Sequence, residues 1–198
     1  MRNKWYFVLA VGGIMLSLCL TSSALFAAEE PADDPVKEAL AKETEDACAA
    51  SAKDKPTPEM IVKKMEEACK LLEAEGKAAF PKFKGKDSQF IFAGTYIWIH
   101  DMEGVMQMHP VKYKMEGKRL IGLKDVNGKL FFTEMNKLAR EKGSGWVDYM
   151  WPKPGEKDPS KKVSFVKLVK IDGVEMVAGC GVYDLPDDVV KKLVEGTK

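Results

Sequence analysis

Residues 143–170 hold the side chains whose types and spacing are best suited to chemistry. Trp146, Tyr149 and Trp151 fall within six residues, and lysines cluster shortly after them. Buried Tyr and Trp side chains need partners for their O–H and N–H groups, and an ammonium group beside such donors holds a carboxylate by charge-assisted hydrogen bonds. The cluster therefore predicts a pocket for a small anion, walled by aromatic rings. The alternative is that each aromatic ring is core packing and each lysine is solvated surface charge.

The sequence offers little for catalysis. It contains two histidines, His100 and His109, and none of the motifs typical of serine hydrolases, zinc proteases, phosphate-binding loops or dinucleotide-binding turns. Two histidines alone make a weak metal site. Acidic pairs such as Asp187 and Asp188 suit the N-terminus of a helix. We therefore expect a binding protein, with no enzyme activity, no metal and no cofactor.

Four cysteines are present, and Cys19 lies in the apolar N-terminal stretch. The other three, Cys48, Cys69 and Cys180, show no CxxC redox spacing, no haem attachment motif and no zinc pattern. An oxidising compartment permits one disulfide among them and leaves one thiol free. Cys69 is the expected participant, with either Cys48 or Cys180 as its partner.

The N-terminus has the pattern of a secretory signal. A short basic start precedes an uncharged stretch from Trp5 to Ala28, in which small residues near Ala24 and Ala27 offer cleavage sites. Residues 1–27 are predicted to be a signal peptide, which places the protein in the periplasm. The alternative is an uncleaved anchor in the inner membrane, because the same stretch is long enough to span a bilayer.

The net charge excludes one class of partner. Cleavage removes two of the 31 basic residues and none of the 30 acidic ones, which changes the formal net charge from +1 to −1. Such a near-neutral chain has no electrostatic footprint for nucleic acid. The remaining length suits one domain with a sizeable core.

Helical patterns dominate the first part of the mature chain. Residues 28–57 are predicted to form an acidic spacer and a first helix over about 36–52, and residues 58–198 one domain. Thr57 is a suitable N-cap for a second helix, with Pro58 at its first position. The apolar stripe of this second helix, expected to pack against a sheet, consists of Ile61, Met65, Cys69 and Leu72.

From Phe90 onward the apolar period changes to two, which is typical of strands. Residues 95–100 and 105–109 are expected to form an antiparallel hairpin whose two faces are both covered. A helix over 130–142 follows, then strands at about 145–151, 162–170 and 174–182, and a short helix from about Pro186. This order predicts an α+β fold with a mostly antiparallel sheet of five to six strands.

Four segments, taken together and in this order, resemble the single Cache domain, type 2, of bacterial extracytoplasmic sensors. They are YIWIHDMEGVMQMHP, GLKDVNGKLFF, GSGWVDYMWPKPGEKDPSKKVSFV and GCGVYD, and the resemblance covers about residues 63–184. It implies a PAS-like fold, in which a long N-terminal helix packs across a central antiparallel sheet. The ligand is then held on the opposite face, under a cap around residues 112–142, and is a small organic acid such as acetate, pyruvate, lactate or propionate.

The resemblance also implies which residues bind the ligand. Matched positions give the set Tyr96, Trp98, His109, Phe131, Trp146, Tyr149, Trp151, Lys162 and Tyr183. We assign Tyr149, Trp151, His109 and Lys162 to the polar end of the ligand, and Trp98 with Phe131 to its apolar end. Two positions depart from the family pattern. Cys180 replaces a small residue, which implies a disulfide to the N-terminal helix, and Phe165 replaces a common tyrosine, which removes one hydroxyl group.

Family members usually lie between two membrane spans that drive a cytoplasmic output module. We expect this domain instead to pass its ligand state to a membrane receptor, kinase or transporter. The alternative is a non-catalytic interaction or scaffold protein with a vestigial pocket, in which side chains fill the interior beneath Trp151. In a third, catalytic interpretation, Cys180 would be a reactive thiol of low pKa.

Overall fold

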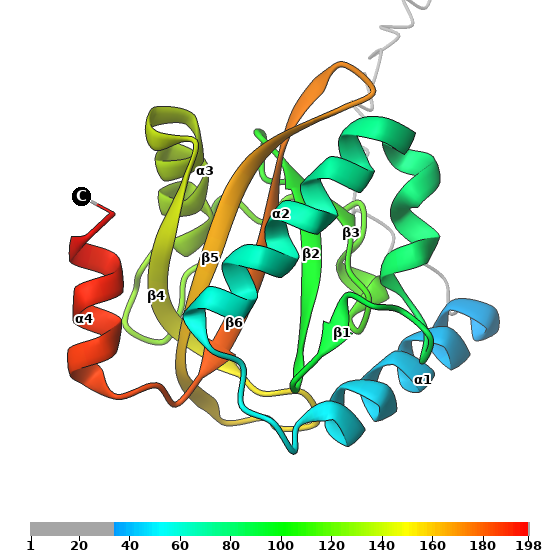
Figure 1. The fold of residues 1–198 in the computed structure, drawn as a ribbon, viewed down its shortest axis with the longest axis horizontal. Coiled ribbons are helices and arrows are strands. Elements are labelled where there is room, and N and C mark those ends of the chain that lie inside the picture. Colours follow the sequence, from blue (N-terminus) through cyan, green and yellow to red (C-terminus); the bar gives the residue numbers. More distant parts are fainter. Residues whose placement is uncertain (1–33, 198) are drawn as a thin grey trace, which may run out of the picture. The chain divides into compact units, whose positions relative to one another are not determined.

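The structure, a computed structural model, describes residues 34–197. The predicted leader, residues 1–27, lies outside the described residues. In chain order the elements are α1 (Pro35–Ser51), α2 (Pro58–Glu75), the 3₁₀ helix η1 (Gly76–Phe83), β1 (Ile91–Phe92), β2 (Thr95–Asp101), β3 (Met106–Met108), the 3₁₀ helix η2 (Tyr113–Met115), α3 (Phe131–Lys142), β4 (Ser144–Pro152), β5 (Pro159–Ile171), β6 (Val174–Tyr183) and α4 (Asp187–Glu195) (Figure 1).

Local sequence signals set the ends of the helices. Asp34 caps α1, because its carboxylate accepts hydrogen bonds from the backbone N–H groups of Val36 and Lys37. Thr57 caps α2 through the Met60 N–H, with Pro58 in the first turn. Gly76 ends α2 at a φ of 63°, in the left-handed region that favours glycine. The predicted second helix is therefore confirmed at both ends.

The strands form one antiparallel sheet in the order β1-β2-β6-β5-β4, and β3 pairs with the end of β2 on the edge away from β6. The long β5–β6 hairpin supplies the middle of the sheet. Its turn, Asp172-Gly173, has positive φ at both residues, as a two-residue hairpin turn requires. The α+β class and the antiparallel sheet predicted from the sequence are confirmed.

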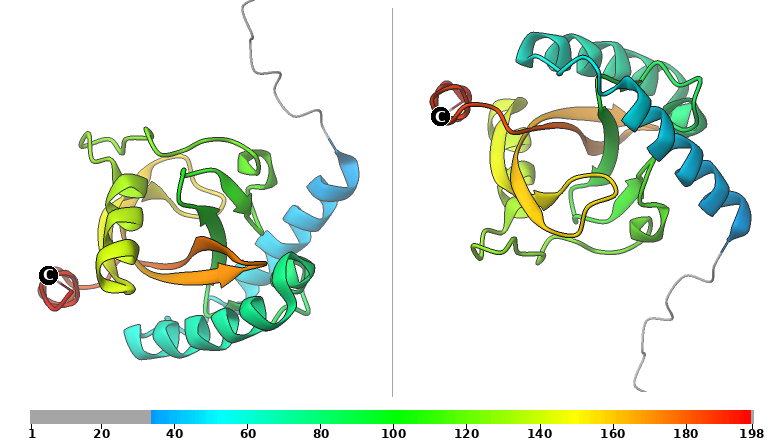
Figure 2. Two further views of the ribbon diagram at one scale, coloured as in Figure 1. Left: turned by 90° about the horizontal axis from the view of Figure 1, so that it is seen from above. Right: turned by 90° about the horizontal axis from the view of Figure 1, so that it is seen from below.

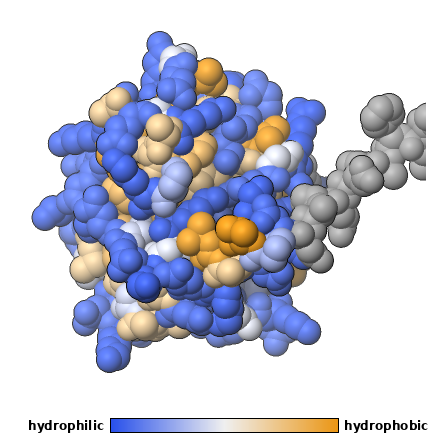
Figure 3. All heavy atoms as spheres, turned by 90° about the vertical axis from the view of Figure 1, so that its right-hand side faces the viewer, coloured by the Kyte–Doolittle hydropathy of each residue, from blue (hydrophilic) through white to orange (hydrophobic). Residues whose placement is uncertain are grey.

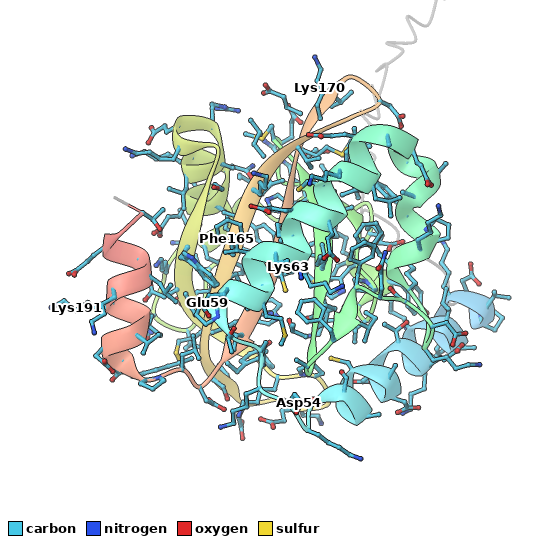
Figure 4. The ribbon with its side chains drawn as sticks, in the orientation of Figure 1. Asp54, Glu59, Lys63, Phe165, Lys170 and Lys191 are labelled. Atoms are coloured by element: carbon cyan, nitrogen blue, oxygen red, sulfur yellow. The ribbon has the colours of Figure 1, made fainter. Side chains whose placement is uncertain are left out.

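Helices cover the sheet from both sides. Figure 2 shows α2 on one side, and α3 with the loop before it on the other. The α2 stripe is fully or almost fully buried against side chains from β2, β5 and β6, among them Ile97 and Phe165. Phe165 is labelled on β5, beside α2, in Figure 4. On the opposite face α3 contributes Phe131, Phe132 and Met135. Every residue of β2 except its last is buried, so the predicted coverage of both faces is confirmed.

The predicted disulfide is not formed: Cys48, Cys69 and Cys180 are free and buried. Cys69 belongs to the core between α2 and the sheet, whereas Cys48 on α1 belongs to the core on the other face. Cys180 lies with its Sγ 3.6 Å from Thr95 Oγ1. Burial raises the pKa of Cys180 to about 12, so its thiol stays protonated and lacks the low pKa of a nucleophile.

The face that carries α1 and η1, at the right of Figure 1, is mostly hydrophilic, with small apolar patches (Figure 3). No helix of residues 34–197 is both long enough and apolar enough to cross a bilayer. Two clusters of buried apolar side chains, one on each face of the sheet, form the core of the described domain.

Candidate ligand-binding site

The register of the central strands gathers the predicted polar side chains in one row. Lys162 on β5 lies opposite Tyr149 on β4 and Tyr183 on β6. Directly opposed residues of an antiparallel sheet point to the same face. Tyr96 and Trp98 reach that face from β2, and the row lies on the side covered by α3. Four strands thus bring side chains that are distant in sequence to one place.

Lys162 is the only cation in this row, and it is almost completely buried, with 4% exposure. Its Nζ lies 5.3 Å from the ring centre of Tyr96, 5.1 Å from that of Trp98 and 4.8 Å from that of Tyr183. Burial, together with the positive charge of Lys112, lowers the pKa of Lys162 to about 7. No carboxylate within residues 34–197 forms an ion pair with it, so three ring faces are its main electrostatic support.

Two glycines of β6 make room for these side chains. A Cβ atom at Gly179 would collide with the Trp98 indole, and one at Gly181 would collide with Lys162 Cε and Ser164 Oγ. The two glycines of the segment Gly179-Cys180-Gly181 therefore let the Trp98 indole and the Lys162 side chain lie directly against the backbone of β6. Any larger residue at Gly181 would displace the ammonium group.

His109 is a neutral hydrogen-bond donor at this site. Its Nδ1 accepts hydrogen bonds from the backbone N–H groups of Lys112, at 2.9 Å, and Val111, at 3.3 Å. These bonds assign the ring proton to Nε2, which is left to donate to another group. Burial lowers the pKa of His109 well below its ordinary value, as do the neighbouring lysines, so the ring is uncharged at neutral pH.

Tyr149 and Phe131 form the wall under α3. The Tyr149 hydroxyl lies 3.0 Å from Ser164 Oγ, and its ring is stacked on Phe131 with centroids 4.4 Å apart. Trp151 meets Phe131 edge-on at 5.4 Å. The Trp98 indole N–H is buried and has no hydrogen-bond partner in the described part of the chain. This orphan donor and the unpaired ammonium of Lys162 are what a carboxylate ligand would satisfy.

The space between these groups is small. A cavity of about 20 Å³ is lined by Tyr96, Trp98, Met106, His109, Met115, Phe131, Phe132, Tyr149, Trp151 and Lys162. That volume holds roughly one water molecule. The structure therefore brings the donors together, but the cavity between them is smaller than the expected pocket for a few-carbon acid. Side chains of the covering loop, among them Met115, fill the space.

Seven of the nine predicted site residues line this cavity. Tyr183 lies against Lys162 but faces a neighbouring groove, and its hydroxyl donates to the Pro152 carbonyl at 2.8 Å. Trp146 lies on the opposite face of the sheet, where its ring packs against Phe165 at 5.2 Å. The predicted ligand contact of Trp146 is therefore corrected to core packing, since side chains alternate along β4 and Tyr149 takes the other side.

Several residues of the site were not predicted. Ser164 follows Lys162 by two positions in the same strand and so lies on the same face of the sheet. The period of two could therefore have predicted it. The glycines at 179 and 181 carry a signal as well, because glycine inside a strand marks a close approach. Met106, Met115 and Phe132 carry no such signal, since their places depend on how β3, the loop that follows it and α3 lie over the sheet.

The cap is taken from here on as the loop of residues 109–130, without α3, which the expected cap over 112–142 included. Two carboxylates help to hold this loop over the site. Glu116 accepts from the His109 N–H at 2.8 Å and pairs with Lys84. Asp125 accepts from the N–H groups of Asn127 and Lys129 within the cap, and from the Met150 N–H of β4 at 3.0 Å. The cap is thus hydrogen-bonded to the edge strand that carries Tyr149 and Trp151.

Other chemistry finds little support in the described residues. His100 lies apart from the cavity, with Nε2 2.8 Å from Asn136 Oδ1, and burial lowers its pKa to about 4. No group of three or more His, Cys, Asp or Glu side chains within residues 34–197 is placed to hold a metal ion. The arrangement around Lys162 is therefore one of hydrogen-bond donors and rings, suited to holding an anion.

Comparison with known families gives this arrangement a context. The family model described as dCache_2, Cache domain, matches residues 37–197. The chain belongs to the Cache domain family. The matched part of the Cache domain begins within α1, so it includes both N-terminal helices.

Two curated proteins resemble part of this Cache domain. The methyl-accepting chemotaxis protein McpP of Pseudomonas putida is 42% identical over 94 residues, which are 48% of this chain and 16% of that protein. The sensor histidine kinase MctS of Rhizobium johnstonii is 32% identical over 88 residues, which are 44% of this chain and 18% of that protein. The matched region is therefore less than a fifth of each relative.

Solved structures are similar to the Cache domain as well. One, described as the structural basis for carboxylic acid recognition by a Cache chemosensory domain, is 37% identical, covers 60% of this chain and 70% of its own, and has a TM-score of 0.43. A periplasmic sensor domain of a chemotaxis protein is 32% identical and covers 75% of this chain and 90% of its own, also with a TM-score of 0.43.

Proposed function

We propose that this protein is a single Cache domain of type 2, exported behind residues 1–27, that binds a short-chain carboxylate in the periplasm without turning it over. Acetate, pyruvate, lactate and propionate are the candidate ligands. The observation that carries the proposal is the buried ammonium of Lys162, which no carboxylate of the described residues neutralises. A carboxylate ligand would supply the missing charge.

Neighbouring donors complete the proposed subsite. The orphan N–H of Trp98 and the Nε2–H of His109 belong to the same cavity lining as Lys162. Charge-assisted hydrogen bonds of this kind are roughly twice as strong as neutral ones. The sequence-based assignment placed Trp151 at the polar end of the ligand and Trp98 at its apolar end, and we now propose the reverse. Phe131 and Trp151 would pack on the carbon end of the acid, because they form the apolar wall beyond Tyr149.

Binding requires the cap to move. A cavity of about 20 Å³ has no room for even a two-carbon acid. We propose that the cap, residues 109–130, opens to admit the ligand and closes on it in a slightly expanded position. A cavity that expands only slightly would also favour acids of two to four carbons over longer ones.

Thermal unfolding with a panel of two- to four-carbon acids tests the proposal. A ligand at a hundred times its Kd stabilises the folded state by about 2.7 kcal/mol. We expect a rise in Tm with at least one acid and none with the matching uncharged amide. Lys162→Ala and Tyr149→Phe should each weaken binding, and unchanged affinity in both would move the site elsewhere.

One observation favours a second candidate function. The interior beneath Trp151 is nearly filled with side chains, as a vestigial pocket would be. In that case the domain is a non-catalytic interaction or scaffold protein, and no acid of the panel should raise its Tm.

The partner is proposed from the relatives. A chemotaxis protein and a sensor histidine kinase share this region, so we propose that the domain reports its ligand state to a membrane receptor, kinase or transporter. Cross-linking in the native host, with and without the acid that binds best, would capture that partner. Retention of residues 1–27 on the purified protein would indicate an inner-membrane anchor in place of a cleaved signal.

A further inference from the structure

Lys112, at the start of the cap, brings a second ammonium group to the candidate site. Its Nζ lies over the ring of Trp151, 5.1 Å from the ring centre, and its backbone N–H donates to His109 Nδ1. The side chain is half-buried, and burial lowers its pKa. One residue of the cap therefore contacts both a wall of the cavity and the histidine that faces it.

The charge of Lys112 acts on the groups that line the cavity. It lowers the pKa values of both Lys162 and His109. Neither Lys112 nor Lys162 makes an ion pair with a carboxylate of residues 34–197, and Glu45 of α1 is the one acidic side chain whose charge acts on Lys112. The closed cap thus holds two like charges near one another without a counter-ion between them.

A cation over an indole ring and a repulsion between two cations have opposite effects on the cap. The contact of Lys112 with Trp151 holds the cap against β4. The repulsion from Lys162 opposes that closure. A carboxylate bound at Lys162 would cancel the repulsion and leave the attraction, so the occupied site would be the one that closes firmly.

We propose that Lys112 is a positioning residue, which closes the cap over an anion bound at Lys162 and makes that closure depend on the charge of the ligand. This inference rests on the proposed function, since it takes the ligand to be an anion. It assigns Lys112 no direct role in recognising the carbon chain, which the rings of Phe131 and Trp151 would contact.

The pH dependence of binding distinguishes this role from simple packing. The titratable and charged groups around the two lysines are Glu45, Cys48, Tyr96, His109, Tyr149, Cys180 and Tyr183. Burial raises the pKa values of the cysteines and tyrosines and lowers that of His109, so these groups are neutral near pH 7. Lys162 itself, with a pKa of about 7, is the group whose proton changes over the range in which acetate stays ionised.

The test is the Kd of acetate between pH 6 and pH 9.5 for the full protein and its Lys112→Gln variant, measured by calorimetry. In the unaltered protein Kd should rise with pH above about 7, as Lys162 loses its proton. At pH 6 the variant should bind about threefold to fivefold more weakly, the size expected for one partly exposed charge interaction. At higher pH the two curves should converge, because Lys162 keeps its proton to higher pH once Lys112 is neutral.

Two control variants and one ligand-free measurement complete the test. Lys112→Arg keeps the charge and the ring contact and should follow the unaltered protein, as should Lys124→Gln, which removes an exposed lysine of the same cap. NMR titration of the Lys162 side chain without ligand should give a higher pKa in Lys112→Gln. If the Kd curves of the unaltered protein and Lys112→Gln ran parallel and the pKa of Lys162 did not shift, the proposed role of Lys112 would be overturned, but the proposed function would stand. Absence of any carboxylate binding by the unaltered protein would overturn the proposed function as well.

Discussion

Lys162 carries a cost in folding stability, because burial lowers the pKa of its ammonium group from 10.5 to about 7. Between these pH values the unfolded chain keeps a proton that the folded chain has released. The contribution of Lys162 to the free energy of unfolding therefore rises as the pH is raised from 7 to 10.5. Such a cost is tolerated at sites that bind charged ligands, where the ligand repays it.

The Lys162→Met variant tests this cost. It removes the buried charge and keeps most of the apolar stem, so we expect it to be more stable than the unaltered protein at pH 7 by a few kcal/mol. The difference should shrink toward pH 10, where the lysine is neutral in the folded state. Urea unfolding at both pH values measures it, with Lys161→Met, on an exposed side chain, as the control. A variant that is less stable at pH 7 would show that the ammonium group has a partner.

Gly181 is a second residue on which the candidate site depends, because it leaves room for the Lys162 side chain. The Gly181→Ala variant places a methyl group where Lys162 Cε and Ser164 Oγ lie. We expect a loss of about 1–3 kcal/mol in the free energy of unfolding, as for other overpacked sites, and loss of acetate binding. Gly122→Ala is the matched control, since a Cβ there meets open space. Acetate affinity that survives in the Gly181 variant would place the ligand away from Lys162.

Single residues also show where prediction from the sequence succeeds and where it fails. Tyr149 and Lys162 were predicted because the sequence itself shows aromatic donors and a lysine at the spacing of neighbouring strands. Trp146 was included although its alternation with Tyr149 points it to the other face. Lys112 was missed because its importance comes from contacts with Trp151 and His109, which only the fold brings together.

The cap is the element on which the proposed ligand exchange depends, and Asp125 is one of its attachments to the sheet. The others include the Lys129–Asp148 ion pair to β4 and backbone hydrogen bonds between residues 117–118 and Met106 of β3. Three backbone N–H groups donate to this carboxylate, one of them from Met150 on β4. Burial alone would raise the pKa of Asp125, but these donors lower it below its ordinary value. The attachment is therefore present at neutral pH and is lost as the pH falls through the lowered pKa.

We expect Asp125→Ala to release the cap without unfolding the sheet. The loss of a carboxylate from three donors should cost about 1–3 kcal/mol. Backbone amides of residues 118–130 should exchange hydrogen faster than in the unaltered protein, and acetate should dissociate faster. Hydrogen-exchange mass spectrometry and stopped-flow release measure the two effects, with Asp158→Ala in the exposed β4–β5 loop as the control. Unchanged exchange in the cap would mean that its backbone bonds to β3, the Lys129–Asp148 pair and its apolar contacts hold it without Asp125.

Elements with local signals were predicted closely. Thr57, Pro58 and Gly76 define α2 through capping and φ, which need no tertiary contact. The strands β4, β5 and β6 follow from their period of two. The two-residue strand β1 and the helix η1 were missed, because pairing with β2 and packing on the core stabilise them and neither has a periodic pattern of its own.

Across the whole described domain, the two faces of the sheet have different roles: one stabilises the fold, and the other carries the candidate site. One face packs against α2 through aliphatic and aromatic side chains, and its core contains no buried lysine or histidine. The other face holds Lys162, His109 and the orphan Trp98 N–H, which cost stability. The apolar core under α2 therefore offsets the cost of the polar site on the opposite side.

The Leu72→Ala variant tests this division. Leu72 is fully buried under α2, and its truncation should lower the free energy of unfolding by about 2–5 kcal/mol. The Kd of acetate should stay within about twofold of that of the unaltered protein at temperatures where the variant is folded, because mutations at distant, unconnected sites add nearly independently. Urea unfolding with and without acetate measures both quantities at once, with Val62→Ala, half-buried on the same helix, as the milder comparison. If affinity fell in step with stability, the packing of α2 would set the geometry of the site through the sheet, and the two faces would act as one unit.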